Sequence, residues 1–169
     1  MLEFYRGYMD LLISGDLKGI LDVLSHMEEN ENTIAAFYHT CGEFFAQQGE
    51  FWFDIEAQER KHALYIQKMK AIIEKKPEHF EKGRPFNIVA ARTIIQGVQA
   101  NTAKVRSGQL NMINALAIAR DNELAIMESR YNEVVKTADI EYLTLVKEIV
   151  EDTAKHKQRI DSMFAKIKN

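Results

Sequence analysis

Apolar residues recur every three to four positions over most of this chain, and very little interrupts the pattern. That spacing is the period of an α-helix, whereas strict alternation of apolar and polar residues would indicate a β-strand. The chain of 169 residues contains only two prolines, Pro77 and Pro85, and both lie in one short stretch. We find no convincing alternating segment. The sequence therefore predicts an all-α protein.

Breaks in this pattern divide the chain into long amphipathic segments. The breaks fall at Gly49, at the stretch that holds both prolines, and at the pairs Ser14-Gly15 and Ser107-Gly108. We predict long helices over 16–47, 50–75, 109–137 and 139–167, a short leading segment over 2–13, and a shorter helix over 88–105 that Asn87 caps. Four long helices that each carry one apolar face are expected to pack as a bundle.

The two halves of the chain resemble each other. Matching residues recur 93 or 94 positions apart, among them His62 with His156 and Tyr38 with Tyr131. This repeat predicts two related helical hairpins. We place the first hairpin at about 16–75, the crossover with its own helix at about 76–108 and the second hairpin at about 109–167, within one domain over 1–169.

Composition narrows the range of functions. The chain has 22 lysines and arginines against 25 aspartates and glutamates, a net charge of −3, so no basic excess is left for a nucleic-acid backbone. Cys41 is the single cysteine, which excludes an internal disulfide, a thiolate zinc site and a cysteine-ligated iron–sulfur cluster within one chain. No run approaches about 18 apolar residues, and the first residues lack the pattern of a signal peptide. We therefore expect a cytoplasmic protein that binds neither nucleic acid nor membrane.

The most informative residues are charged side chains at positions where the helical pattern calls for apolar ones. Glu31 lies on the apolar stripe of the first long helix, and Glu59 and His62 lie three residues apart on that of the second. Glu123 and His156 lie on the stripes of the third and fourth. Side chains at i and i+3 share one helix face, so Glu59 and His62 could ligate one metal ion, or the carboxylate could bridge two. A buried carboxylate is costly unless it is paired, hydrogen-bonded or metal-bound, so several in one core indicate a metal centre.

Each of these residues also has a plainer interpretation. Glu59 and His62 could form salt bridges on a solvated helix face, since basic residues stand between them. Glu31 belongs to a cluster of glutamates, of which one would face inward by chance. His156 could be a hydrogen-bonded core histidine, and Tyr38 is expected to be a packed aromatic residue.

One ordered series of residues in the first half matches the pattern of a known family. Glu31 is followed seven residues later by Tyr38, then by Gly49, and then by Glu59-x-x-His62 with an alanine behind it. This order resembles the first half of the rubrerythrin branch of the ferritin-like superfamily. The crossover and the second hairpin resemble its second half, so the resemblance covers about residues 14–165. It implies a ferritin-like four-helix bundle in which one Glu from each of two helices and a Glu-x-x-His from each of the other two hold a carboxylate-bridged di-iron centre.

Carried over position by position, the resemblance implies a set of metal ligands with one departure. The implied ligands of two iron ions, or of manganese or zinc in their place, are Glu31, Glu59, His62, Glu123 and His156. The sixth position holds Thr153 where the family has a glutamate, which leaves the repulsion between two cations less well offset. Asp152, four residues before His156, could reach the same site. Strict use of the repeat would select Leu124 on the third helix, and we favour Glu123 because its helical neighbours are apolar.

The resemblance also implies a function. It indicates an oxidoreductase of the peroxidase or ferroxidase type, in oxidative stress or iron handling, that forms a homodimer. Rubrerythrins proper carry a rubredoxin-like module with four cysteines, so this chain would need a separate electron-donor protein. Two alternatives stay open. One is a ferritin-like structural or interaction protein whose degenerate site binds one ion or none. The other is a helical adaptor unrelated to ferritins, which would place no carboxylate in its core.

Overall fold

Helices make up almost all of the protein. The computed structural model describes the backbone of residues 2–168 and the side chains of residues 16–168. The long helices are α1 (Leu2–Phe44), α2 (Gly49–Lys75), α3 (Ile88–Arg106), α4 (Met112–Ser129) and α5 (Ile140–Lys168). Single 3-10 turns occur at Ala46–Gln48, Pro77–His79 and Tyr131–Glu133. Two short strands, β1 (Glu81–Lys82) and β2 (Val135–Lys136), pair antiparallel, so the chain belongs to the all-α class.

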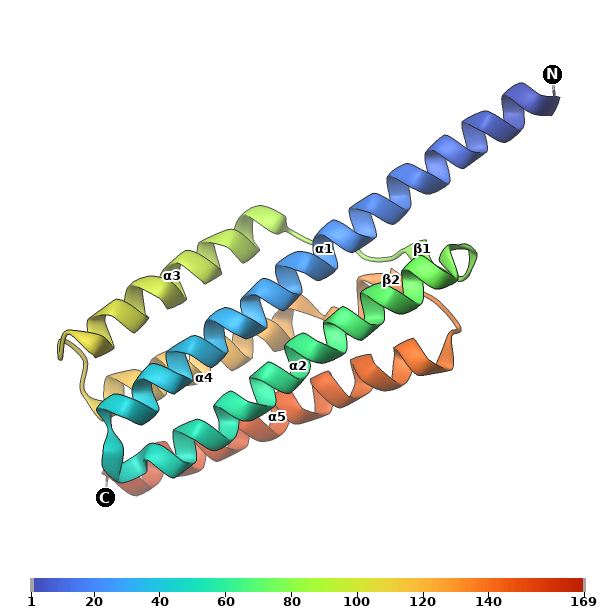
Figure 1. Cartoon of the computed structure of the whole chain (residues 1–169). Helices are drawn as coiled ribbons and strands as arrows, with labels where there is room; N and C mark the ends of the chain where they lie inside the picture. Colours follow the sequence, from blue (N-terminus) through green and yellow to red (C-terminus); the bar gives the residue numbers. More distant parts are fainter. Residues whose placement is uncertain (1, 169) are drawn as a thin grey trace.

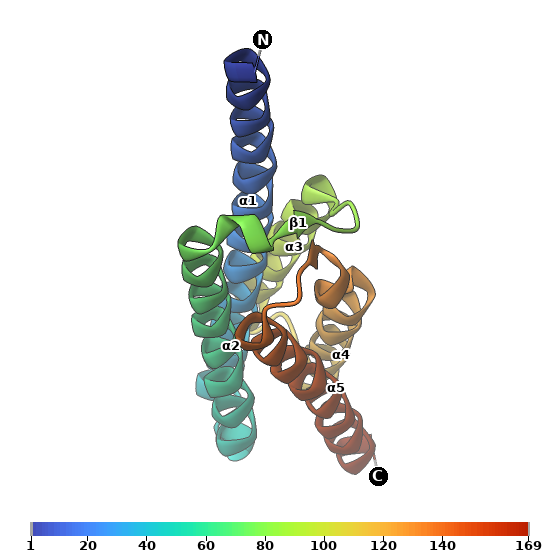
Figure 2. The ribbon, with the colours of Figure 1, turned by 90° about the vertical axis from the view of Figure 1, so that its right-hand side faces the viewer.

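The long helices form two antiparallel pairs with a fifth helix alongside. A connection of only four residues turns α1 back along α2, and α4 and α5 form the second pair (Figure 1). Contacts between α5 and α2 join the two pairs. In both views α1 lies between α2 and α3 (Figures 1 and 2). At its N-terminal end α1 extends past the other helices (Figure 1).

The predicted helices agree with the structure to within three residues except at two places. The bounds of α2, α3 and α5 lie within one or two residues of the prediction. Asn87 caps α3 as predicted, because its side chain accepts a hydrogen bond of 3.0 Å from the amide of Ala90. The predicted break at Ser14-Gly15 is wrong, since the backbone of α1 stays helical from Leu2 to Phe44. One glycine costs a helix about 1 kcal/mol relative to alanine, which is too little to end so long a helix.

The third long helix is shorter than predicted. We expected a helix to about residue 137, but α4 ends at Ser129. Arg130 adopts a left-handed backbone conformation with φ of 50°, which stops the helix, and a single 3-10 turn follows. A non-glycine residue in this conformation costs about 1 kcal/mol or more, so the surrounding structure must hold it there. No glycine or proline marks this position in the sequence, and the helical period therefore gave no sign of the break.

A short backbone ladder holds the crossover against the α4–α5 connection. The amide of Gly83 donates to the carbonyl of Val134 at 2.9 Å, and the amide of Arg84 donates to that of Glu133 at 2.7 Å. A side chain at position 83 would overlap the Glu133 carbonyl, so this close approach requires glycine. These strands of two residues are too short for an alternating pattern, which is why the sequence did not predict them.

The apolar stripes of the helices meet in one core. Trp52 on α2 is fully buried, with its ring centroid 5.7 Å from that of Tyr38 and 6.4 Å from that of Phe37, both on α1. Further core residues come from every pair and include Leu24, Met27, Ile34, Ile66, Met69, Leu116, Ile149 and Ile160. This core surrounds the polar residues described below and excludes water from them.

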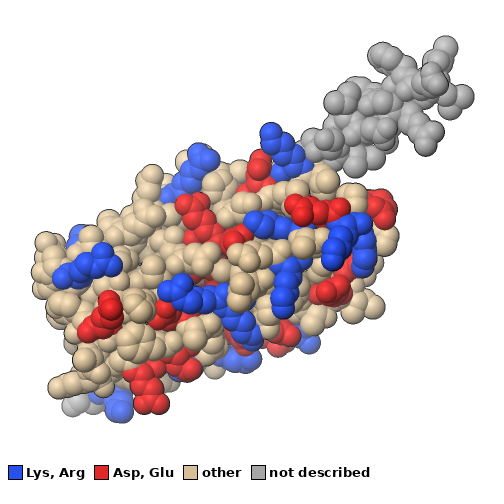
Figure 3. Space-filling view, viewed as in Figure 1, with Lys and Arg blue, Asp and Glu red and all other residues tan. Residues whose placement is uncertain are grey.

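The surface carries charge of both signs. On the face drawn in Figure 3, basic and acidic side chains are interspersed and no large area of one sign is formed. None of the helices in the described part of the chain has the length and hydrophobicity needed to cross a bilayer.

Candidate metal centre

Five polar side chains selected from the sequence are fully buried in the middle of the protein. They are Glu31 from α1, Glu59 and His62 from α2, Glu123 from α4 and His156 from α5. On α2 the two residues between Glu59 and His62 are exposed, so the i, i+3 pair faces inward and its basic neighbours face solvent. The interpretation of Glu59 and His62 as a solvated helix face is therefore wrong.

Glu59 is the central residue of this group. One of its carboxylate oxygens, Oε2, lies 3.2 Å from Nδ1 of His62, and the other, Oε1, lies 2.7 Å from Nδ1 of His156. Glu31 Oε2 lies 3.5 Å from the same nitrogen of His62, and Glu123 Oε2 lies 3.8 Å from that of His156. Each histidine thus directs Nδ1 toward two carboxylates, and Glu59 is shared between them. The two imidazole rings stack with their centroids 5.4 Å apart.

Many of these buried polar atoms have no hydrogen-bond partner. Both oxygens of Glu31, Oε2 of Glu123 and Nε2 of His62 are in this state among the described residues, and Oε1 of Glu59 and Nδ1 of His156, although 2.7 Å apart, do not meet in hydrogen-bonding geometry. An unsatisfied buried polar group costs about 1–3 kcal/mol, and more when it is charged. A cation among these atoms would remove that cost, since carboxylate oxygens and imidazole nitrogens are ligands of divalent metals. Glu59, His62 and His156 offer ligand atoms within 4.8 Å of one another and could hold a metal ion.

The outer nitrogen of each histidine faces a polar side chain on another helix, but only that of His156 lies within hydrogen-bond distance of it. Nε2 of His156 lies 2.9 Å from Oε1 of Gln58, and because an amide oxygen only accepts, this nitrogen donates. Nε2 of His62 lies 3.8 Å from Oδ2 of Asp152. Such outer contacts fix the tautomer of a metal-ligating histidine and the direction of its ring. Nothing in the spacing of the sequence selected Gln58 for this role.

Asp152 and Thr153 occupy positions different from that of a sixth ligand. The partly exposed carboxylate of Asp152 lies behind His62, where Lys155 at 2.8 Å and Lys61 at 3.5 Å pair with it. It therefore lies near the outer nitrogen of His62 without a hydrogen bond to it and is not among the inward-facing atoms. Thr153 is fully buried, and its hydroxyl donates to the backbone carbonyl of Ile149 at 2.8 Å. Its hydrogen is thus engaged within its own helix.

Two tyrosines near the centre each form a hydrogen bond from one helix pair to the other. Tyr38 on α1 packs against Trp52, as expected of a core aromatic, and its hydroxyl also donates to Oε1 of Glu123 on α4. Tyr131, directly after α4, accepts a hydrogen bond of 3.2 Å from Asn30. Burial raises the pKa of Tyr131 far above its usual range, and the nearby charge of Glu31 adds to that shift. The repeat that pairs Tyr38 with Tyr131 in the sequence was the available signal for this arrangement.

The protonation of the group reflects its crowded negative charge. Burial and the neighbouring charge of Glu59 raise the pKa of Glu31 to about 8 and raise that of Glu123 well above its usual range. Burial also opposes ionisation of Glu59, but its contacts with His156 and His62 hold its pKa well below the usual range. Burial disfavours the charged form of His62, yet contacts with Glu31 and Glu59 outweigh it and raise its pKa to about 10. In the metal-free state, the protons held by Glu31 and His62 therefore offset negative charge that a bound metal cation would otherwise neutralise.

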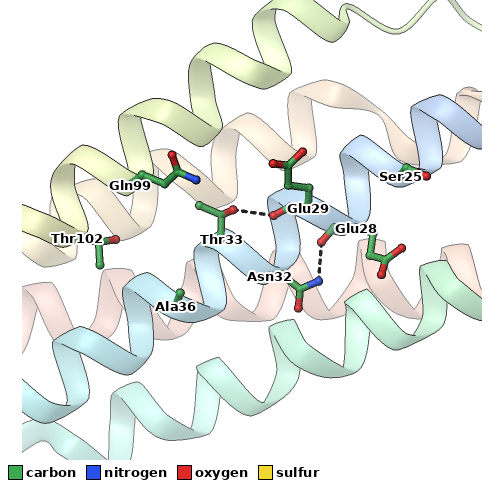
Figure 4. A pocket seen from close by; sticks show the side chains of 8 residues that line it. All are labelled: Ser25, Glu28, Glu29, Asn32, Thr33, Ala36, Gln99 and Thr102. Atoms are coloured by element: carbon green, nitrogen blue, oxygen red, sulfur yellow. Dashed lines mark hydrogen bonds between the residues drawn. The ribbon is translucent and has the colours of Figure 1, made fainter.

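A second polar region lies on the opposite side of α1. It is a hollow of about 570 Å³ between α1 and α3 that includes Glu28, Glu29, Thr33 and Gln99 (Figure 4). The Thr33 hydroxyl is bonded to the carbonyl of Glu29, and Asn32 to that of Glu28, so both are satisfied within α1 (Figure 4). Its side chains lack the inward convergence of the buried group.

The chain was compared with protein-family models, with curated proteins and with solved structures, and no match was found in any of the three. The metal-ligand chemistry of the buried group therefore rests on this chain's own residues.

Proposed function

We propose that this protein is a rubrerythrin-like non-haem di-metal carboxylate protein with the architecture of a ferritin-like four-helix bundle. It would act as an oxidoreductase of the peroxidase or ferroxidase type in oxidative stress or iron handling. The observation that carries the proposal is the convergence of three buried carboxylates and two buried imidazoles, several of whose polar atoms have no partner.

The arrangement of the helices supports this architecture. The antiparallel pairs α1–α2 and α4–α5 would be the two hairpins of the bundle, and α3 would be the helix of the crossover. Each of the four bundle helices contributes at least one residue to the buried group. A site of this kind, built from side chains on facing helices, is typical of metal-binding bundles.

The roles of the residues follow from their contacts. Glu59 contacts both histidines and is placed to bridge two ions, while Glu31 and Glu123 would each hold one ion beside His62 and His156 respectively. The Tyr38 hydroxyl orients Glu123. Bound iron or manganese would supply the electron transfer that no side chain here provides. The surrounding apolar core keeps water from the group and strengthens its electrostatic interactions.

Partners are part of the proposal. The single cysteine of the chain cannot hold a rubredoxin-type iron, so electrons would come from a separate donor protein. We expect a homodimer, as the resemblance implies.

Metal content provides the first test. We expect protein purified without chelators and loaded anaerobically with Fe(II) to retain up to two irons per chain by elemental analysis. Glu59→Gln should abolish retention, because it removes the shared carboxylate. Glu56→Gln is the matched control: Glu56 lies one turn earlier on α2, is also largely buried, and pairs with Arg60 and His39 outside the candidate centre. Exposure of the loaded protein to dioxygen or hydrogen peroxide should change its near-ultraviolet spectrum.

Equal iron retention in Glu59→Gln and the unchanged protein would contradict the proposal. Zinc or manganese in place of iron would preserve the site but change its chemistry, since zinc has no redox activity.

The second candidate is a ferritin-like structural or interaction protein whose site holds one ion or none. Thr153 favours it, because the residue beside His156 offers no carboxylate and its hydroxyl is bonded to Ile149. The three residues whose ligand atoms lie closest together suit a single ion. One iron or none, without a spectral change on oxidation, is the result that this candidate predicts.

A further inference from the structure

A small cavity lies beside the candidate metal centre, between α4 and α5. Its volume is about 100 Å³. We call it the Thr153 cavity; it is lined by Ile126, Met127, Tyr131, Ile149, Val150 and Thr153, together with the exposed polar residues Arg130 and Asn132. Four of these side chains are buried, whereas Met127 and Val150 are 44% and 41% exposed. The cavity therefore extends from the surface to residues of the interior.

The inner end of the cavity lies near the centre through Thr153 and Tyr131, although none of the five buried polar residues lines it. Thr153 lies one turn before His156 on α5, and both side chains are fully buried. The Tyr131 hydroxyl accepts a hydrogen bond from Asn30, the residue next to Glu31 on α1. The repeat within the chain places Thr153 opposite Glu59 of the first hairpin. Threonine is smaller than glutamate, and the cavity lies on the side of the centre where Thr153 is found.

The chemistry of the walls selects the kind of molecule that fits. Ile126, Ile149 and Val150 present only hydrocarbon. At the inner end the Thr153 hydroxyl donates to a backbone carbonyl and the Tyr131 oxygen accepts from Asn30, while the polar lining residues Arg130 and Asn132 are exposed to solvent. A water molecule needs two to four polar partners, and an apolar cavity of ~150 Å³ stays dry and binds xenon or benzene. The Thr153 cavity is smaller and suits a molecule of two or three heavy atoms.

We propose that the Thr153 cavity binds a dioxygen-sized apolar molecule directly beside the candidate metal centre. The assignment of dioxygen, and not hydrogen peroxide, as the molecule delivered there rests on the proposed function. The capacity of the cavity to bind an apolar gas does not depend on metal. Compared with a glutamate, Thr153 removes a carboxylate from the site and leaves room for a small apolar molecule.

Xenon binding to the metal-free protein tests the cavity alone. Crystals of the full chain pressurised with xenon should show one site in contact with Ile149 and Thr153. Val150→Trp should abolish this site, since the larger side chain covers the opening of the cavity. Leu143→Trp is the matched control, because Leu143 lies two turns away on α5, is 43% exposed and does not line the cavity. Met127→Trp covers the opening from α4 and replaces Val150→Trp should that variant not fold.

No xenon in the unchanged protein, or equal xenon in Val150→Trp and Leu143→Trp, would overturn the proposal whatever metal the protein holds. In iron-loaded protein, Val150→Trp should slow the oxidation of Fe(II) by dioxygen, and Leu143→Trp should leave it unchanged. Equal slowing of the reactions with dioxygen and with hydrogen peroxide would overturn the assignment to dioxygen. A chain that binds xenon at this site but retains no iron would contradict the proposed function and leave the cavity established, so the two failures are distinguishable.

Discussion

The two histidine-bearing helices of the candidate centre are related by the repeat, yet they supply different things. On α2, Glu59 stands one turn before His62 and contacts both histidines. On α5, the equivalent position before His156 holds Thr153, whose hydroxyl is bonded to its own helix. The first hairpin therefore contributes two carboxylates, while the second contributes one carboxylate and a cavity. The repeated backbone preserves the geometry of the site without preserving its charge.

This difference decides how many ions the centre can neutralise. Three buried carboxylates carry three negative charges when they are ionised. One divalent ion would leave one negative charge, and two would leave one positive charge. A fourth carboxylate at position 153 would balance two divalent ions. Because the first ion meets three negative charges and the second meets only one, the second ion should bind more weakly than the first.

The largest effect on stability is expected from removing Glu59, the charged member of the pair Glu59 and Thr153. In the metal-free protein, Glu59→Ala should lower the free energy of unfolding by about 3–5 kcal/mol, since it leaves the histidines without their buried partner. Thr153→Ala should cost only about 1 kcal/mol, because it removes a methyl group and one local hydrogen bond. Urea denaturation followed by circular dichroism measures both values. Equal losses in the two variants would show that the helices are equivalent after all.

The pH dependence of metal binding should reveal the protons that the ligand side chains carry when no metal is bound. Glu31, with its pKa of about 8, and His62, with its pKa of about 10, are both protonated in the metal-free protein at pH 7. Both must lose their protons to act as ligands, so metal affinity should rise with pH up to these values. The expected rise is up to ~100-fold per pH unit for these two protons, and more where Glu123, whose pKa is also raised, gives up a third. Proton release on Mn(II) addition, followed with an indicator in weak buffer, measures the number. No release at pH 7 would contradict this protonation state.

Restoring the missing carboxylate should make the two helices alike. Thr153→Glu is expected to raise the iron content of the protein toward two ions per chain, because it balances the second cation. Thr153→Gln is the matched control, since it has nearly the same volume and carries no charge. Elemental analysis after anaerobic loading gives the stoichiometry. The same iron content in both variants would count against charge as the reason for weaker binding.

The smallest effect concerns the tyrosines that connect the two halves. Tyr38→Phe and Tyr131→Phe should each lower the free energy of unfolding by about 1 kcal/mol, because each leaves one buried polar partner unsatisfied. Their effects should be nearly additive, since the two hydroxyls contact different residues. Denaturation of the single and double variants tests this expectation. A neutral Tyr38→Phe would show that its contact with Glu123 contributes no stability.

The helical periodicity of the sequence predicted the all-α class and placed α2, α3 and α5 closely. It failed where a local backbone choice overrides periodicity. The break after Ser129 depends on the left-handed conformation of Arg130, which the contacts of the α4–α5 connection maintain. The supposed break at Ser14-Gly15 is absent, because a single glycine does not end a long helix.

The candidate site could be predicted in part for a related reason. A charged residue on an apolar stripe indicates burial, and this signal selected Glu31, Glu59, Glu123 and the two histidines. The helical period alone does not show which way a side chain turns beyond its Cα–Cβ bond. The engagement of Thr153 with its own backbone, the position of Asp152 behind His62 and the contact of Gln58 with His156 therefore needed the structure.

The measurement that most directly tests the account is anomalous diffraction from crystals loaded with Fe(II) or Mn(II). The account predicts a metal peak within bonding distance of Glu59 and of Nδ1 of His62 or His156. A second peak should lie about 3.5–4 Å from the first wherever two ions bind. Anomalous peaks only at surface carboxylates, with the buried group unchanged, would contradict the claim that these residues form a metal centre.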